Sequence, residues 1–162
     1  MAEPFTVRVQ TADFDVGAEL ARLHGPTVGA LASFVGTVRA EQDGAPLEAL
    51  HLEHYPGMTE RAIGAMLDEA RSRFALTGAT VVHRVGTLAV GAHIVLVATA
   101  SGHRQAAFEA CAFLMDYLKT QAPFWKRAHT ATGAQWVTAS ATDDAALARW
   151  GVASANAAGG QP

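Results

Sequence analysis

VVHRVGTLAVGAHIVLVATASGHRQAAFEACAFLMDYLK, residues 81–119, sets the architecture of the chain. The first half is rich in β-branched residues and predicts two largely buried strands, over 78–88 and 92–100, joined by a hairpin bend. Ser101-Gly102 can cap the helix predicted over 103–119, whose apolar residues repeat at helical spacing. Paired strands followed by a long helix are typical of an α+β domain rather than of a doubly wound parallel sheet.

Segments on both sides continue this irregular alternation of strands and helices. Strands are recognised by alternating or β-branched residues, and helices by apolar residues three and four apart. The predicted elements are a strand over 5–9, a helix over 13–23, a buried strand over 28–38, a strand over 47–55 that pairs back on it through a turn at Asp43-Gly44, a surface helix over 58–74, short strands over 124–126 and 135–139, and a helix over 143–150.

Length and composition indicate one compact domain over residues 1–152, followed by a small, polar, disordered tail over 153–162. Half of the residues are apolar, but no apolar run reaches the roughly 18 residues of a membrane-spanning helix. The formal net charge of −3 gives no global basic field for nucleic acid, so an anion site must be local. A single cysteine and an N-terminus without a secretory signal favour the cytoplasm.

The common catalytic fingerprints are missing from the sequence. It contains neither a phosphate-binding P-loop, nor a dinucleotide-binding glycine motif, nor a serine nucleophile elbow, nor a zinc-protease helix. His51 and His54 lie three apart on a predicted strand, which directs them to opposite faces, so we expect no metal site there.

An anion site is predicted at Ser101-Gly102-His103-Arg104, where a strand ends and a helix begins. Free backbone N–H groups, the positive end of the helix dipole and two basic side chains would meet at this point. The alternative is that His103 and Arg104 occupy a solvated first turn, although the helix dipole disfavours cations there.

Two lysines are predicted to face one pocket. Lys119 lies one helical turn after Met115, and Lys126 follows the helix break at Pro123. Neighbouring cations lower a lysine pKa, and a partly neutral lysine can act as a base or nucleophile. Solvated surface charge is the alternative for both residues.

Other reactive side chains are weaker candidates. Arg39 ends a strand and can reach into a cleft from the sheet edge, whereas Arg84 lies in mid-strand and fits a paired, partly buried arginine. Cys111 lies on the apolar stripe of its helix, where a cysteine usually packs as an inert small residue.

Five blocks carry a family resemblance that covers about Phe5 to Trp150. In chain order they resemble the large, catalytic subunit of molybdopterin synthase. The blocks are FVGTVR (34–39), LEHYPGM (52–58), HRVGTLAVG (83–91), HRQAAFEAC (103–111) and LKTQAPFWKR (118–127).

The resemblance implies an α/β hammerhead-like α+β fold with an antiparallel β subdomain, and a cytoplasmic sulfurtransferase of molybdenum cofactor biosynthesis. Its substrate is cyclic pyranopterin monophosphate, called precursor Z, which receives the two dithiolene sulfurs of molybdopterin. The donor is a small ubiquitin-like subunit with a C-terminal Gly-Gly thiocarboxylate, and two donors are needed per product. The complex is a heterotetramer on a central homodimer of large subunits, and the chain needs no cofactor.

The resemblance also assigns roles to individual residues. Lys119 is the main catalytic group and Lys126 assists it, while Arg39, His103 and Arg104 hold the cyclic phosphate. The implied substrate-binding set is Thr37, Val38, Arg39, His103, Arg104, Lys119, Lys126, Arg127 and Ala128, and the candidate walls of the channel for the donor tail are Phe34, Met115, Pro123 and Phe124.

Two positions depart from the family pattern. Ala128 stands where many members carry glutamate, and Ser140 lies near a position that is often arginine. These departures leave open a noncatalytic homologue that binds anions or the small subunit without turnover. A third hypothesis, an acyl- or phosphate-ester enzyme with a Cys111 or histidine nucleophile, requires that residue to be exposed beside a base.

Overall fold

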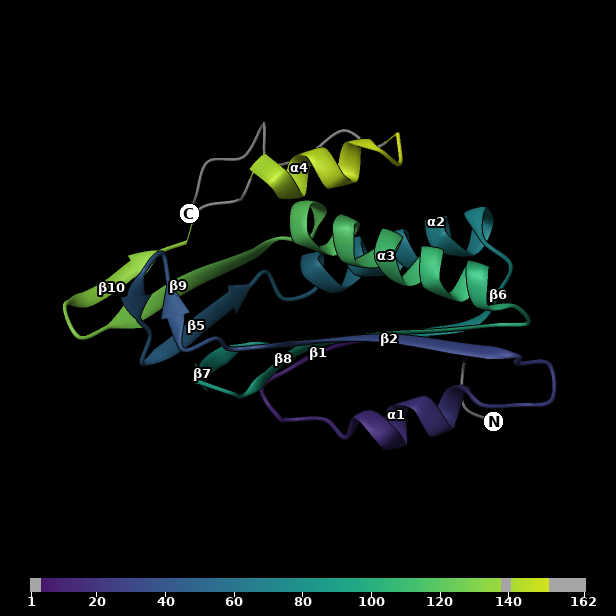
Figure 1. Cartoon of the computed structure of the whole chain (residues 1–162), viewed down its shortest axis with the longest axis horizontal. Helices are drawn as coiled ribbons and strands as arrows, with labels where there is room; N and C mark the ends of the chain where they lie inside the picture. The colour runs from purple at the N-terminus through teal and green to yellow at the C-terminus, as the bar shows by residue number, and fades with distance from the viewer. Residues whose placement is uncertain (1–3, 138–140, 152–162) are drawn as a thin grey trace.

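Two four-stranded sheets, a two-stranded hairpin and four helices make up the described part of the chain (Figure 1). The computed structural model describes residues 4–137 and 141–151. Ser140 and the tail predicted over 153–162 lie outside the described residues.

The larger sheet has the strand order β1 (Phe5–Gln10), β6 (Leu76–Arg84), β8 (His93–Ser101) and β2 (Ala30–Thr37). Only β1 and β6 run parallel; the other neighbours are antiparallel. β6 and β8 are central and carry unbroken runs of buried residues, because both faces of the sheet are covered. The predicted pairing of these two strands is confirmed.

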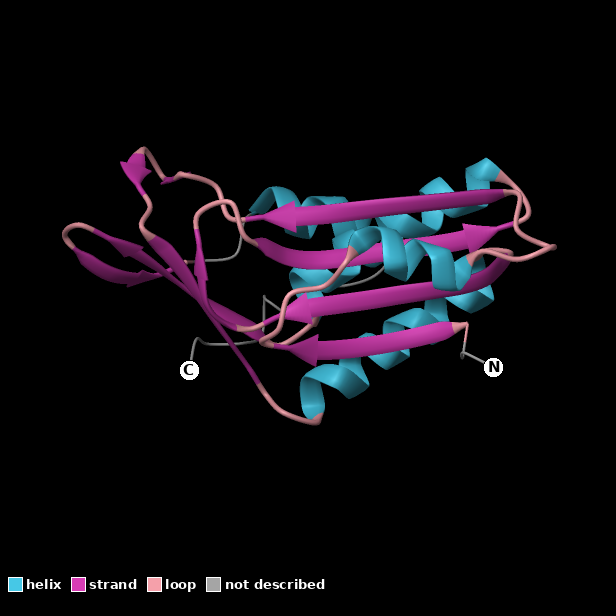
Figure 2. Cartoon of the chain, turned by 90° about the horizontal axis from the view of Figure 1, so that it is seen from below, coloured by secondary structure: helices cyan, strands magenta, loops and turns pink. Residues whose placement is uncertain are grey.

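Helices cover the two faces of this sheet unequally (Figures 1 and 2). α2 (Met58–Arg73) and α3 (Arg104–Gln121) pack on one face, and α1 (Val16–Leu23), capped by the Asp15 side chain, packs on the other. Phe113 and Met66 are fully buried in the core between the sheet and α2 and α3. Within the described ranges, no helix combines the length and apolarity needed to cross a membrane.

The smaller sheet has the order β10 (Gly133–Trp136), β9 (Phe124–Thr130), β5 (Ala49–His54) and β7 (Gly86–Ala89), and every pair is antiparallel. The predicted α+β fold with an antiparallel subdomain is confirmed. A short hairpin, β3 (Glu41–Gln42) and β4 (Ala45–Pro46), and the last helix, α4 (Ala141–Ala148), complete the described elements.

Three strand predictions were wrong in detail. The segment 47–55 does not pair back on 28–38: the turn at Asp43-Gly44, with φ of 49° and 81°, closes only the β3–β4 hairpin, and β5 joins the smaller sheet. β2 is an edge strand rather than a buried one, and its Phe34 is 41% exposed. The strand predicted over 78–88 is divided at Gly86, whose φ of 91° sends β7 into the smaller sheet.

Candidate active site

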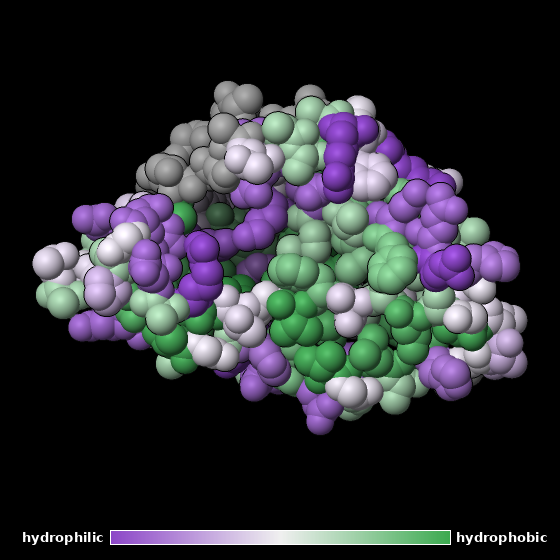
Figure 3. Space-filling view, viewed as in Figure 1, coloured by the Kyte–Doolittle hydropathy of each residue, from purple (hydrophilic) through white to green (hydrophobic). Residues whose placement is uncertain are grey.

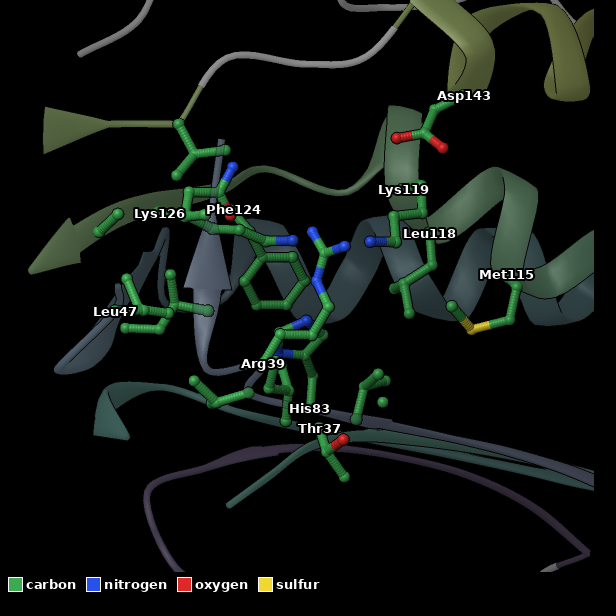
Figure 4. Close-up of a pocket in the computed structure, with 18 of the residues that line it drawn as sticks. Thr37, Arg39, Leu47, His83, Met115, Leu118, Lys119, Phe124, Lys126 and Asp143 are labelled. Carbon is green, nitrogen blue, oxygen red and sulfur yellow. The ribbon is translucent and has the colours of Figure 1, made fainter. Parts of the chain in front are cut away.

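A cavity of about 740 Å³ lies where the two sheets meet the C-terminal end of α3 (Figure 4). The larger sheet contributes the end of β2 and the residues after it, and the smaller sheet contributes β5 and β9. The ionisable residues of the cavity wall are Arg39, Glu41, Asp43, His83, Lys119, Lys126 and Asp143.

Both lysines of the 162-residue chain line this cavity. Lys119 enters from α3 and Lys126 from β9, and Figure 4 shows their amines directed toward the same space as the Arg39 guanidinium. The two lysines and Arg39 therefore line the same cavity, as the sequence predicts. Three cations around one cavity attract an anion and give it charge-assisted hydrogen bonds.

The amine of Lys126 is the most strongly perturbed of these cations. Burial, which is the largest cause, and the positive charges of Lys119 and Arg39 together lower the pKa of Lys126 to about 8, while Asp143 opposes them. At neutral pH Lys126 is therefore mostly charged but can release its proton readily. A lysine in this state can serve as an acid and, after proton loss, as a base.

His83 lies in the cavity wall and was not among the predicted site residues. Its ring is 5% exposed and stacks on Phe124 with 3.8 Å between ring centroids. Nδ1 lies 2.8 Å from the carbonyl oxygen of Arg84, which places the proton on Nδ1 in the neutral ring. Burial is the largest cause that lowers the pKa of His83 to about 3, so the imidazole is neutral at physiological pH.

Most of the other residues taken from the resemblance also border the cavity. Arg127 does not, because adjacent residues of a strand face opposite sides. Its guanidinium lies 3.5 Å from Glu53 and stacks over the ring of Trp136, which itself borders the cavity. Pro123 is also outside the wall, and its carbonyl accepts a hydrogen bond from Thr59. The other residues implied by the resemblance that line the cavity are Phe34, Thr37, Val38, Met115, Phe124 and Ala128.

His103 and Arg104 do not line the cavity of their own chain. They lie at the first turn of α3, and a helix rises about 1.5 Å per residue, so about 24 Å of helix separates His103 from Lys119. Gly29 fixes this end of the helix: a Cβ there would lie 2.2 Å from the carbonyl oxygen of Gly102. The predicted phosphate site of Arg39, His103 and Arg104 is therefore not assembled within one chain.

The weaker candidates have structural partners. Cys111 is 8% exposed, and burial raises the pKa of its thiol to about 11, which argues against a thiolate nucleophile. Arg84 donates to the carbonyl oxygens of Thr11 and His93, as expected for a paired arginine. His51 and His54 contact different acids, Glu53 and Glu60.

An α+β fold with three cations around a cavity between its two sheets is typical of proteins that bind a small anionic ligand. The profile of the family described as "MoaE protein" matches residues 9–121, and the chain belongs to this family. It is 57% identical over 154 residues to the molybdopterin synthase catalytic subunit of Ralstonia nicotianae, covering 94% of this chain and 88% of that protein.

Solved structures agree with this family. The molybdopterin biosynthesis MoaE protein from Burkholderia ambifaria superposes with a TM-score of 0.78 at 54% identity, covering 91% of this chain and 98% of that one. A more distant match in fold, with a TM-score of 0.63 and 19% identity, covers 83% of this chain and 90% of that one. It comes from the complex of subunits 1 and 2 of the Helicobacter pylori molybdopterin-converting factor.

Sequence reasoning missed four ionisable residues of the cavity, namely Glu41, Asp43, His83 and Asp143. The sequence pattern predicts His83 only as part of a strand, although a histidine inside an apolar run is itself a signal of a polar partner or a site. The pattern predicts Asp143 only as part of the last helix, and nothing in the neighbouring residues indicates that this helix reaches the lysines.

Proposed function

We propose that this protein is the catalytic subunit of a cytoplasmic molybdopterin synthase. It transfers sulfur from the thiocarboxylate of a small ubiquitin-like subunit to precursor Z. The observation that carries the proposal is the convergence of Lys119, Lys126 and Arg39 on one cavity in a chain closely similar to proteins of that name. The Helicobacter pylori complex of two subunits supports a small-subunit partner.

The cavity suits this chemistry because both reactants are anions. The cations draw the phosphate and the thiocarboxylate out of water and hold them together. The thiocarboxylate sulfur bonds to an electrophilic carbon of the pterin side chain, and the carbon–oxygen bond at that carbon breaks as its oxygen takes up a proton and leaves. Water then adds to the acyl carbonyl and cleaves the acyl–sulfur bond, so that the sulfur stays on the pterin and the donor is released as a carboxylate. Lys119 and Lys126 exchange protons with the substrate and stabilise the oxyanions that develop. Phe34, Met115 and Phe124 are apolar parts of the wall suited to an extended Gly-Gly tail.

Lys119 provides the direct test. The purified chain is incubated with precursor Z and thiocarboxylated small subunit, and molybdopterin is quantified for the wild type, Lys119→Ala and Lys119→Arg. We expect product from the wild type only, with both variants still binding the small subunit, because arginine keeps the charge but does not release a proton. Near-normal turnover by Lys119→Ala would refute the catalytic assignment. A stable wild-type complex without product would instead favour the noncatalytic alternative.

We also propose that a second copy of the chain supplies His103 and Arg104 to this cavity. Among the described strands, none pairs with the outer edge of β2, and Figure 3 shows hydrophobic residues gathered over β2 and the adjacent part of α3, beside the polar hollow. Leu31, Phe34 and Phe108 are 38%, 41% and 65% exposed. Open apolar edges of this kind favour pairing with another strand.

The register of β2 explains how the second copy could reach the cavity. Ala30 pairs with Ser101 at one end of the strand, and Thr37 lines the cavity at the other end. In a twofold antiparallel pair of β2 strands, each strand start lies opposite the partner's strand end. The partner subunit's Arg104, just beyond its Ser101, then comes to the Thr37 end and completes the anion site.

Complementation between variants tests this arrangement. Arg104→Ala and Lys119→Ala are each inactive as homodimers. After mixing and subunit exchange, a mixed dimer has one complete cavity if Arg104 acts on the partner. About a quarter of the wild-type activity then returns at equal mixing. If Arg104 acted on its own chain, the mixture would stay inactive, and a monomer in light scattering would also exclude the arrangement.

A further inference from the structure

Among the described residues, Asp143 is the only carboxylate of the cavity wall that is carried by a helix. Figure 4 shows it projecting from α4 toward the space that holds the amines of Lys119 and Lys126. The other two acids of the wall, Glu41 and Asp43, belong to the exposed β3–β4 hairpin. Asp143 thus adds a carboxylate, on the side of the cavity where Lys119 lies, to a wall that carries three cations.

The helix that carries Asp143 is firmly attached at its other end. Leu147 is fully buried against the core. Asp116 of α3 accepts hydrogen bonds from Arg149 at 2.8 Å and from the Trp150 indole at 2.7 Å. The Trp150 ring packs edge-on against Phe74 and Phe113, and its carbonyl oxygen accepts from Arg73. This anchoring holds the first turn of α4, with Asp143, over the lysines.

We propose that Asp143 is the counter-ion of the lysine pair, a positioning residue that keeps Lys126 protonated and ordered in the empty cavity. This inference rests on the proposed function, because it takes the two lysines as the reacting groups. Without a facing anion, two ammonium groups and a guanidinium in one partly buried space would repel one another and favour loss of a proton.

The charges around Lys126 agree with this role. Asp143 raises the pKa of Lys126, against the lowering by burial, Lys119 and Arg39. His83 is neutral and adds no charge at physiological pH. The ionisable groups that face Lys126 in the cavity are Lys119 from α3, Arg39 after β2, His83 from β6, Asp143 from α4, and Glu41 and Asp43 from the β3–β4 hairpin.

The presence of only two lysines makes a direct experiment possible. Reductive methylation with formaldehyde and cyanoborohydride modifies neutral amines, and peptide mass spectrometry then follows Lys119 and Lys126 separately between about pH 6 and pH 10. The variants are Asp143→Asn, Asp143→Glu and Asp144→Asn. Asp144 is the matched control, because it is the next residue of α4 and carries the same charge but does not line the cavity.

We expect Asp143→Asn to move the methylation midpoint of Lys126 to lower pH by about half a unit or more. Asp143→Glu restores the wild-type midpoint, and Asp144→Asn leaves it in place. Thermal unfolding of all three variants shows that α4 remains attached. An unchanged Lys126 midpoint in Asp143→Asn, or an equal shift in Asp144→Asn, would overturn the inference. Labelling needs neither substrate nor donor, so a failure of the proposed function would be seen separately, as absence of product.

Discussion

The two sheets of this protein differ in what their side chains do. The larger sheet is covered on both faces, and its central strands β6 and β8 consist almost wholly of buried residues. The smaller sheet has a modest apolar cluster on one face, and every residue of its edge strand β10 is exposed. The larger sheet therefore supplies the stability, and the smaller sheet adds one wall of a cavity. Lys126 projects from that wall toward groups held by the stable half.

The largest expected difference between the two regions concerns stability. Phe113 is fully buried among Phe74, Tyr117 and Trp150, so Phe113→Ala should lower the free energy of unfolding by about 3–5 kcal/mol. Trp136 on β10 is 38% exposed and stacks with Arg127, so Trp136→Ala should cost less than about 1 kcal/mol. Denaturant unfolding measures both. Equal losses would show that the smaller sheet is as tightly packed as the larger one.

Within the smaller sheet, neighbouring residues on opposite faces should separate activity from structure. Lys126→Ala should reduce molybdopterin formation at least about a hundredfold, because it removes a proton-exchanging group from the cavity. It should not lower the melting temperature, since a buried ammonium costs desolvation energy. Arg127→Ala is the matched control and should keep turnover near the wild-type value. A comparable loss in Arg127→Ala would show that the face of β9 opposite to Lys126 takes part in the reaction.

His83, from the larger sheet, should make stability depend on pH. The unfolded chain protonates this histidine near pH 6.5, whereas the folded protein does so only near a pKa of about 3. Protons therefore favour the unfolded state as the pH falls through this window, and the free energy of unfolding should drop by about 1.4 kcal/mol per pH unit. His83→Gln should flatten this slope between pH 6 and pH 4. His24→Gln, at an exposed histidine, should leave it unchanged.

The smallest effect is expected at Cys111. Its sulfur lies 3.8 Å from the carbonyl oxygen of Val97 inside the larger core. Cys111→Ala should cost about 1 kcal/mol or less and leave sulfur transfer intact, because the thiol is buried and outside the cavity wall. Loss of product in this variant, or rapid alkylation of the native thiol, would revive the cysteine-nucleophile hypothesis.

Local patterns were sufficient to predict most helices, the pairing of β6 with β8 and the approach of Lys119 and Lys126, because each depends on spacing within one segment. They failed where partner choice depends on the rest of the chain. A β-branched run such as 28–38 fits a buried strand and an apolar edge strand equally well, so the edge position of β2 was not visible. The positive φ of Gly86 divides a strand that appears continuous in its residue types.

The candidate site could likewise be predicted only where local patterns determine it. Strand alternation places the side chains of Arg127 and Lys126 on opposite faces of β9. This could be predicted only if the strand was known to continue beyond residue 126. His103 and Arg104 were grouped with Arg39 by charge and by the family resemblance, whereas the length of α3 holds them apart. Asp143 reaches the lysines through the docking of α4 on α3, which no local pattern encodes.

The confinement of both lysines to one cavity has a consequence for side reactions. A donor whose C-terminal carbonyl is activated as a thiocarboxylate can acylate a primary amine and form a stable isopeptide bond. The ten remaining basic side chains, leaving histidine aside, are all arginines, whose guanidinium stays protonated and does not attack an acyl group. Outside the cavity the chain therefore offers the tail of the proposed donor no lysine on which to become trapped, so an isopeptide bond to a lysine would report specifically on the cavity.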